Sequence, residues 1–147
     1  MSEARGQRSE IRSQPESPRG AIRSFTDLIV WQKARTLGQR VFELSKAWPT
    51  VERYALIDQV RRSSRSVGAN IAEAWGKRRY EASFVAKLVD SDAEAHETEH
   101  WLIVAHDHEY LRSDDLDQLR DLLSEIGRML GSMINKPKAF VSRQSDV

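Results

Sequence analysis

Three histidines in the segment HETEHWLIVAH, residues 96–106, have a spacing that occurs in zinc proteases. His96 and His100 flank Glu97 in the pattern H-E-x-x-H, in which two histidines bind zinc and the glutamate serves as general base. His106 stands where the metzincin proteases place a third zinc ligand. Residues four apart share one face of a helix, so His96 and His100 are compatible with a metal site.

The third histidine is the weak point of this zinc hypothesis. In metzincins, a glycine after the second histidine ends the helix and turns the third histidine back to the metal. That position holds Ile103, in the unbroken apolar run WLIVA. If the helix continues, His106 lies about 15 Å further along the axis than His96. We therefore expect no catalytic residue, metal or cofactor, and a zinc hydrolase through His96, Glu97 and His100 is the remote alternative.

The composition indicates one globular domain with a heavily charged surface. The chain has 147 residues, of which 39% are hydrophobic and 31% charged, and its formal net charge is +1. This charge gives no overall attraction to nucleic acid or membrane. The lack of cysteine excludes disulfides and thiolate metal sites and suits a reducing cytoplasm. We find neither an apolar secretory signal nor a run of about 18 to 20 apolar residues, so we expect a cytoplasmic protein without membrane contact.

Apolar residues at spacings of three and four predict four helices between residues 25 and 136. Long helices joined by short turns predict an all-α, antiparallel, up-down-up-down four-helix bundle. Capping residues, glycine and proline predict the boundaries. The first helix begins after Thr26 or Asp27 and ends at AWPT, the second runs from after Thr50 to Gly76, the third from Tyr80 or Ala82 to His108, and the fourth from Ser113, as N-cap, to just before Pro137.

The two ends of the chain differ from this helical region. Residues 1–24 are rich in Ser, Arg, Glu, Pro and Gly, hold one strong apolar residue, Ile11, and carry a net charge of +2. Such a segment buries too little apolar surface to order itself, so we expect a disordered leader. The sharper alternative is a basic arm that contacts an anionic partner. Residues 137–147 are expected to be a frayed tail.

Charge is distributed unevenly between the predicted helices. Residues 50–79, which include the second helix, carry a net charge of +4. Residues 80–111, which include the third helix, carry a net charge of −7. Complementary strips of this kind favour packing between neighbouring helices or between subunits.

Three sequence patterns are informative in combination. The pattern L-x-V-W-Q-x-A begins at Leu28, P-x-x-E-x-Y-x-L begins at Pro49, and Q-V-R-R-x-x-x-S-V-x-x-N-I-A-E spans residues 59–73. Over residues 25–135 the chain resembles a bacterial four-helix-bundle family first named from reading frames in intervening sequences of 23S ribosomal RNA genes. It departs from that family at Ala74, where glycine is usual, and at Gly68, where proline or alanine is common. The positions that carry the family pattern include Trp31, Gln59, Asn70, Glu73, Glu94 and Glu97.

The resemblance implies a bundle that assembles into a homopentameric ring. It also implies kinship with the accessory variability determinant proteins of diversity-generating retroelements, which bind nucleic acid and a reverse transcriptase. No catalytic activity accompanies the family. The expected partners are therefore further copies of the chain, RNA or DNA, and a reverse transcriptase or another protein.

Basic residues of the second helix are the candidate nucleic-acid contacts. Arginine binds phosphate well, and an aromatic side chain nearby adds a surface on which a base can stack. The better candidates cluster at the end of the helix, and a second group lies along one flank. The first group is Lys77, Arg78, Arg79 and Tyr80, and the second is Arg61, Arg62 and Arg65.

The flank arginines have a structural alternative, which is pairing with Asp58 and with acids of the third helix, either within the chain or across a subunit boundary. We expect the amide of Asn70 to bond across the bundle, because an unpaired buried amide is costly. Tryptophans and histidines are expected at the core or at interfaces. The leading hypothesis is a non-enzymatic, homo-oligomeric adaptor that binds nucleic acid or a ribonucleoprotein, and the alternative is an assembly module for a protein partner.

Overall fold

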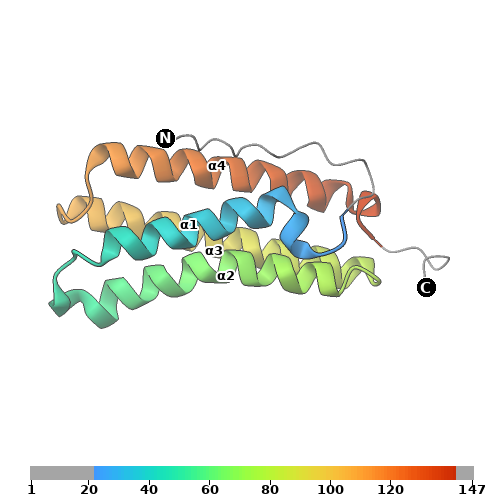
Figure 1. Ribbon diagram of the computed structural model, residues 1–147, viewed down its shortest axis with the longest axis horizontal. Coiled ribbons are helices and arrows are strands. Elements are labelled where there is room, and N and C mark those ends of the chain that lie inside the picture. Colours follow the sequence, from blue (N-terminus) through green and yellow to red (C-terminus); the bar gives the residue numbers. More distant parts are fainter. Residues whose placement is uncertain (1–21, 142–147) are drawn as a thin grey trace, which may run out of the picture.

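The computed structural model describes residues 22–141, and these residues form helices without any strand. The four predicted long helices are confirmed, and they lie side by side along the long axis of the molecule (Figure 1). Of the expected leader and tail, residues 1–21 and 142–147 lie outside the described part. The long helices are α1 (Ile29–Ser45), α2 (Asp58–Gly76), α3 (Glu81–Asp107) and α4 (Ser113–Asn135).

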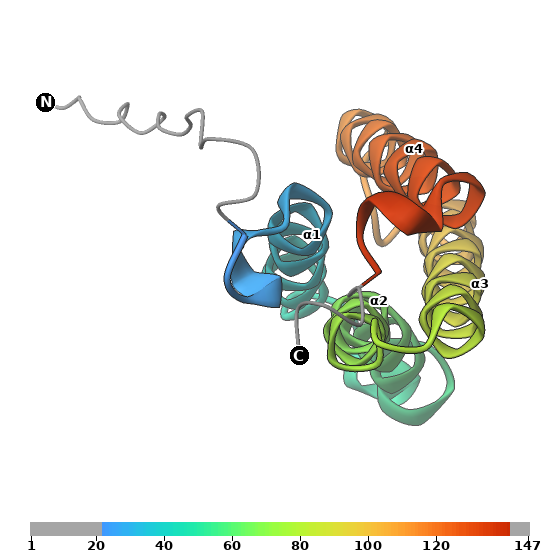
Figure 2. The same cartoon turned by 90° about the vertical axis from the view of Figure 1, so that its right-hand side faces the viewer.

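The core consists of the apolar stripes that the sequence predicts. On α4, the residues at spacings of three and four are all buried, namely Leu116, Leu119, Leu123, Ile126, Leu130 and Met133. They face matching stripes on the other helices, and the end-on view shows the helices around this shared interior (Figure 2). The most extensive packing joins α2 and α3. Within residues 22–141, no helix is long and apolar enough to cross a bilayer.

Polar groups between the helices are matched by hydrogen bonds. The hydroxyls of Ser63 and Thr98 are both fully buried and lie 2.8 Å apart across the α2–α3 contact. Ser91 Oγ, also fully buried, donates to the carbonyl oxygen of Val67 at 2.8 Å. These contacts allow small hydroxyl residues at core positions, because each buried hydroxyl finds a partner.

Contacts between consecutive helices proceed in opposite directions along the sequence. From α1 to α2, Trp31 lies against Gly68, whereas Ser45 bonds to Arg61. From α2 to α3, Ser63 contacts Thr98, whereas the contacts of Glu73 are with Lys87. In each pair, the partner residue moves toward lower numbers as the chain proceeds along the first helix.

The helix boundaries differ from the predictions at several caps. The predicted N-cap of the first long helix at Thr26 or Asp27 is wrong, because α1 begins at Ile29 with Leu28 as its N-cap. Ser24 caps the 3-10 turn Phe25–Asp27 that precedes it, and its hydroxyl accepts a bond from the backbone N–H of Thr26. α4 begins at Ser113 with Arg112 as its N-cap, so the predicted cap at Ser113 is wrong by one residue. Two short segments, a 3-10 turn and a π-helix, precede α2 and continue into it, and they are Thr50–Glu52 and Arg53–Ile57.

Of the tail that was expected to fray, residues 137–141 are described, and they form a turn that packs on the bundle. A 3-10 turn, Pro137–Ala139, follows the helix. It brings the ring of Phe140 onto that of Phe84, with centroids 6.2 Å apart. Phe84 has no exposed surface, so this turn closes one end of the core.

Candidate nucleic-acid interface

The predicted phosphate-binding residues Lys77 to Tyr80 form the tight turn between α2 and α3. Lys77 is the C-cap of α2, and its N–H bonds to the carbonyl oxygens of Glu73 and Ala74. Tyr80 is the N-cap residue of α3, and its own N–H bonds to the carbonyl of Lys77 at 2.9 Å. The turn therefore places three consecutive cations and one tyrosine on a short, hydrogen-bonded segment.

One cation of this turn is held in place and the others are exposed. The guanidinium of Arg78 lies 4.0 Å from the ring centroid of Trp75, and its Nη1 donates to the carbonyl oxygen of Trp75 at 2.9 Å. Lys77 and Arg79 are exposed, and Tyr80 retains 64% of its surface. An arginine stacked on tryptophan keeps its other N–H groups available, so the turn can present several donors to one anion.

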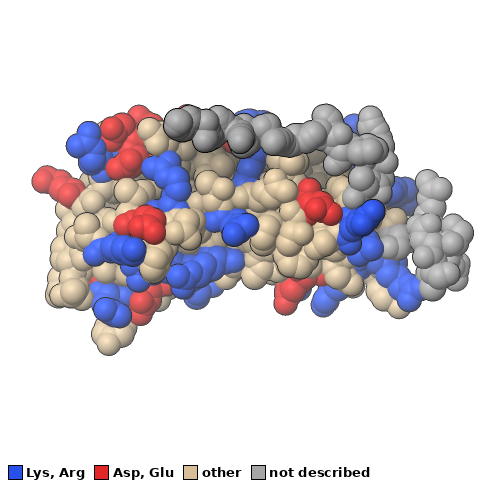
Figure 3. Space-filling view, in the orientation of Figure 1, with Lys and Arg blue, Asp and Glu red and all other residues tan. Residues whose placement is uncertain are grey.

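Two further lysines, which the sequence analysis missed, lie at the same end of the bundle. Lys136 and Lys138 follow α4, and the Nζ of Lys138 lies 3.4 Å from a carboxylate oxygen of Glu81, the residue after Tyr80. Figure 3 shows blue side chains gathered at this end of the molecule. The available signal was Pro137 between two lysines, because proline begins a new turn that returns the chain to the bundle.

Of the three flank arginines, one pairs with the acidic helix. Arg62 forms bonds of 3.1 Å to Glu94 and 2.9 Å to Glu97, which confirms the expected pairing with the third helix for this residue. Glu97 also accepts a bond from the indole Nε1 of Trp101 at 3.0 Å. The hydrogen bonds from Trp101 and Arg62 lower the pKa of Glu97. The hydrogen bonds to Glu94 and Glu97 raise the pKa of Arg62. These contacts assign Glu94 and Glu97 a structural role between α2 and α3.

The other two flank arginines meet an aromatic ring rather than Asp58 or an acid of the third helix within the chain, and pairing across a subunit boundary stays a prediction for them. Arg61 lies 4.8 Å and Arg65 5.7 Å from the ring centroid of Phe42 on α1, and the Nε of Arg61 donates to Ser45 at 2.8 Å. Lys46 approaches the same ring at 4.8 Å. Three cations thus share one phenylalanine, and the contacts of Arg61 and Arg65 with it are tertiary contacts that no local pattern predicts.

A groove runs between α1 and α2 beside this cluster. It has a volume of about 370 Å³, small residues form its floor, and aromatic and basic side chains form its walls. The face of α1 and α2 that contains it is crossed by blue side chains with few red ones (Figure 3). Among the residues that line it are Trp31, Ala34, Arg35, Gly38, Phe42, Arg65, Gly68 and Ala69.

Asn70 and Glu73, the centre of the family pattern, both meet Lys87 of α3. The amide Nδ2 of Asn70 donates to the carbonyl of Ser66 on its own helix at 2.9 Å, and its Oδ1 accepts from Lys87 at 3.5 Å. The expected bond across the bundle is therefore present but is only one of two. Lys87 lies 2.8 Å from Glu73, and this bond lowers the pKa of Glu73. Gln59 is half-buried on α2.

The histidine motif lies on a continuous helix, as expected from Ile103. His96 and His100 are exposed on α3, and the Nδ1 of His96 lies 2.8 Å from the carbonyl oxygen of Asp92. His106 instead bonds to Ser113 of α4 at 3.0 Å. Nowhere in residues 22–141 do three His, Cys, Asp or Glu side chains converge as metal ligands. Glu97, the general base of that hypothesis, is already bonded to Arg62 and Trp101. This geometry does not favour the zinc hydrolase alternative.

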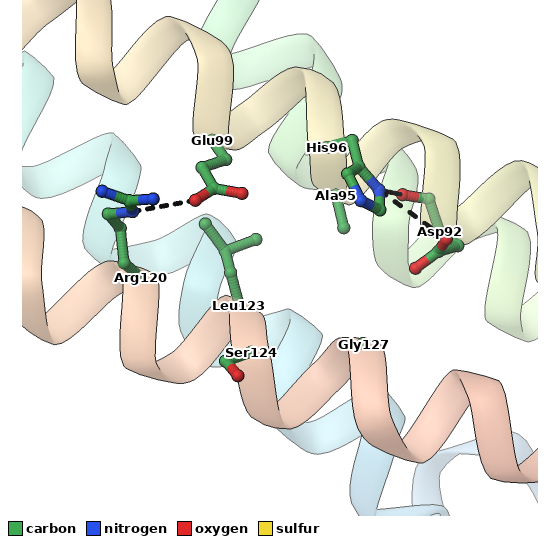
Figure 4. Close-up of a pocket in the computed structure, with 8 residues that line it drawn as sticks. All are labelled: Asp92, Ala95, His96, Glu99, Arg120, Leu123, Ser124 and Gly127. Carbon is green, nitrogen blue, oxygen red and sulfur yellow. Dashed lines mark hydrogen bonds and ion pairs between the residues drawn. The ribbon is translucent and has the colours of Figure 1, made fainter.

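A shallow pocket of about 340 Å³ lies between α3 and α4 beside His96 (Figure 4). In it, Glu99 is bonded to Arg120 of α4 at 2.8 Å, and His96 leans along its own helix toward Asp92. The floor is formed by Ala95, Leu123 and Gly127. The pocket has no free acid and base facing one reaction point, so it does not have the geometry of an active site.

The tryptophans support the packing of the helix ends. Trp48 is buried, and Trp31, Trp75 and Trp101 are half-buried against the core. Trp31 packs edge-to-face on Phe25 at 5.2 Å and lies over Gly68. A side-chain carbon at Gly68 would meet Trp31 at an ordinary 3.5 Å, which explains why alanine is compatible with this position.

Comparison with known proteins agrees with this architecture. A search of curated proteins found no match. A crystal structure of a protein of unknown function from the S23 ribosomal protein family of Bacteroides thetaiotaomicron VPI-5482 is 30% identical and matches with a TM-score of 0.66, covering 73% of this chain and 96% of that one. The family model of the 23S rRNA-intervening sequence protein matches residues 26–132. The family that the sequence patterns predicted is thereby confirmed, and the chain belongs to the 23S rRNA-intervening sequence proteins.

Proposed function

We propose that the chain is a non-enzymatic, homo-oligomeric helical bundle that binds nucleic acid, either structured RNA or an RNA/DNA complex, or a ribonucleoprotein. The observation that carries this proposal is the α2–α3 turn. It presents Lys77, Arg78 and Arg79 consecutively, with Arg78 held on Trp75 and with an exposed Tyr80.

The chemistry of the turn suits a phosphate backbone next to an unstacked base. When Lys77 and Arg79 neutralise phosphates, the counterions condensed on the nucleic acid are released, and this release favours binding. Stacking of a base on the ring of Tyr80 adds affinity with little dependence on sequence. Lys136 and Lys138 extend the positive end and favour a ligand longer than one nucleotide.

The wider setting of this proposal follows the family resemblance. We propose an antiparallel up-down-up-down bundle, supported by the opposed order of the helix contacts, that assembles into a homopentameric ring in the cytoplasm. We also propose kinship with the accessory variability determinant proteins, which would make a reverse transcriptase a candidate protein partner. The absence of cysteine supports a reducing compartment.

Charge reversal of the turn tests nucleic-acid binding. Replacing Lys77, Arg78 and Arg79 by glutamate should weaken binding to structured RNA and flatten the dependence of log K on log salt by about 2 for single-stranded contacts. Fluorescence anisotropy over a series of salt concentrations measures both quantities.

The matched control reverses three arginines outside the turn, so that the net charge changes equally. These are Arg53, Arg112 and Arg128, and the triple variant should retain most of the salt dependence. Equal loss in both variants would mean that binding follows net charge rather than this turn. Wild-type protein that binds neither RNA nor DNA at low ionic strength would refute the proposal.

A second candidate function is an assembly module for a protein partner without a nucleic-acid role. The contact of Arg61 and Arg65 with Phe42 favours it, because these cations stack on a ring of the neighbouring helix α1. Reversing both charges should then disrupt the oligomer in light scattering. Under this alternative, reversal of the Lys77 to Arg79 charges should leave partner binding unchanged.

A further inference from the structure

α3 carries an apolar stripe that faces the core and, on its exposed side, a second line of three alanines, one valine and two histidines. The inner stripe is buried and includes Phe84, Leu88 and Leu102. The outer stripe is fully on the exposed side, and Val89 in it retains 49% of its surface. Its residues follow a spacing of four, three, four, three and four, and they are Ala82, Ala86, Val89, Ala93, His96 and His100.

This outer stripe has the form of a helix-docking seam. Residues that alternate at spacings of three and four form a continuous line along a helix, as in coiled coils. Exposed alanines are common on helices, so the residue that points to a covering partner is Val89, a large apolar side chain that retains 49% of its surface in the middle of this line. The small side chains allow another backbone to approach closely. The seam is flanked by carboxylates, Asp90 toward α2 and Asp92 toward α4.

The groove between α1 and α2 is the complementary surface on the same chain. Its floor consists of small residues, and additional side-chain carbons at Gly38 and Gly68 would meet only ordinary contacts at 3.5 Å or more. The rim of the groove is basic and includes Arg35 and Arg65. The seam lies on α3, and residues 80–111, which contain this helix, carry a net charge of −7. A ridge of alanines with acidic flanks fits such a groove in both shape and charge.

We infer that the outer stripe of α3 docks into the α1–α2 groove of a second copy of this chain. This inference rests on the proposed homo-oligomer and extends it by naming the two surfaces. In the end-on view, α3 lies on the opposite side of the bundle from α1 (Figure 2). Each copy therefore offers the stripe on one side and the groove on another. Such a contact is heterologous, and it generates a ring when its rotation closes.

Two blocked variants test the pairing of these surfaces. Ala86→Arg with Ala93→Arg blocks the stripe, and Gly38→Gln fills the groove. Ala86 and Ala93 are exposed, and a side-chain carbon at Gly38 would meet its nearest neighbours at an ordinary 3.9 Å, so circular dichroism and urea unfolding should match the wild type. Ala55→Arg, at an exposed alanine outside both surfaces, is the matched control and should leave assembly intact.

Sedimentation velocity should show a wild-type oligomer and a monomer for each blocked variant. A mixture of the two variants should form a dimer and nothing larger, because one intact stripe then meets one intact groove. This complementation distinguishes a heterologous contact from a symmetric one, in which the mixture gains no dimer.

Other outcomes overturn the inference in separable ways. A wild-type monomer refutes the homo-oligomer together with this interface. An oligomer that persists in both blocked variants leaves the homo-oligomer standing and refutes these surfaces. An oligomer that persists in Gly38→Gln while RNA binding is lost would assign the groove to nucleic acid instead.

Discussion

Single side chains in this protein act mainly as links between helices. Glu97 shows this most clearly, because the sequence offers it as a general base whereas the fold uses it to bind Arg62 and Trp101. The glutamate of an H-E-x-x-H sequence here stabilises the contact between two helices and does not act as a general base. What separates the two uses is the neighbouring helix α2, because its Arg62 faces the carboxylate that a zinc-bound water would need.

Glu97 should make stability depend on pH. Its pKa is lowered in the folded state, first by the Trp101 bond and then by Arg62. The stabilisation is therefore fully present above the ordinary value of 4.5 and is lost as the pH falls through the lowered value. We expect Glu97→Gln to be less stable than wild type at pH 7 and to approach it in acid.

Urea unfolding at several pH values measures this difference. Trp101→Phe removes the indole donor, which is the largest cause of the shift, and should reduce the pH-dependent part without abolishing it. A constant gap between wild type and Glu97→Gln from pH 7 into acid would contradict the assignment.

The buried hydroxyl pair Ser63 and Thr98 should contribute cooperatively. Both hydroxyls are fully buried, and Thr98 also bonds to the carbonyl oxygen of Glu94 at 2.9 Å. Removing one partner leaves the other without its cross-helix bond, at a cost of about 1 kcal/mol in unfolding free energy. A double-mutant cycle with Ser63→Ala and Thr98→Val should therefore show a coupling of about 1 kcal/mol. Additive losses would mean that each hydroxyl is satisfied within its own helix.

At the level of elements, the periodicity of apolar residues predicted the position of each long helix and the face that it buries, because these features depend on the sequence of that helix alone. The stripe from Leu116 to Met133 sits at regular spacing, so α4 and its buried face followed directly from the sequence. The turn at Lys77 to Tyr80 was also predictable, because Gly76 ends the helix before a run of cations. The predicted N-cap of α4, Ser113, is wrong by one residue, because Arg112 is the N-cap. The hydroxyl of Ser113 bonds instead to His106 on α3.

Contacts between distant elements could not be read from the sequence. Phe42 lies on α1 and Arg61 on α2, and nothing in either local pattern indicates that the ring and the guanidinium stack. The second stripe on α3 was equally hidden, because alanines at spacings of three and four are common on ordinary helices. It became visible only when the structure showed which side of α3 faces the core.

The closing turn after α4 should stabilise the bundle. Phe140 is half-buried and stacks on the fully buried Phe84. We expect Phe140→Ala to lower the unfolding free energy by about 1 to 2 kcal/mol, less than for a fully buried aromatic residue. Lys138→Ala in the same turn is the control, and it should have no measurable effect because the lysine is almost fully exposed. Equal effects in urea unfolding would show that the turn acts through charge and not through the ring.

The whole molecule is electrically asymmetric along its length. The end with the α2–α3 turn carries Lys77, Arg78 and Arg79, whereas acidic residues such as Asp114 and Asp115 begin α4 at the other end. Rotation about a ring axis leaves the direction along that axis unchanged. If the helices run along the axis, every basic end of a cyclic oligomer therefore lies on the same rim.

This geometry predicts that assembly strengthens binding to long nucleic acids but not to short ones. An RNA long enough to contact several turns on the rim gains effective concentration at each further turn, which can raise affinity about 100-fold or more without a new type of contact. A short oligonucleotide contacts one turn and gains nothing. Gly38→Gln, which blocks assembly without changing charge, should therefore bind a short oligonucleotide as wild type does and a long RNA far more weakly. Anisotropy titrations with both ligands measure the two affinities, and a proportional loss for both lengths would mean that the basic ends do not act together on one rim.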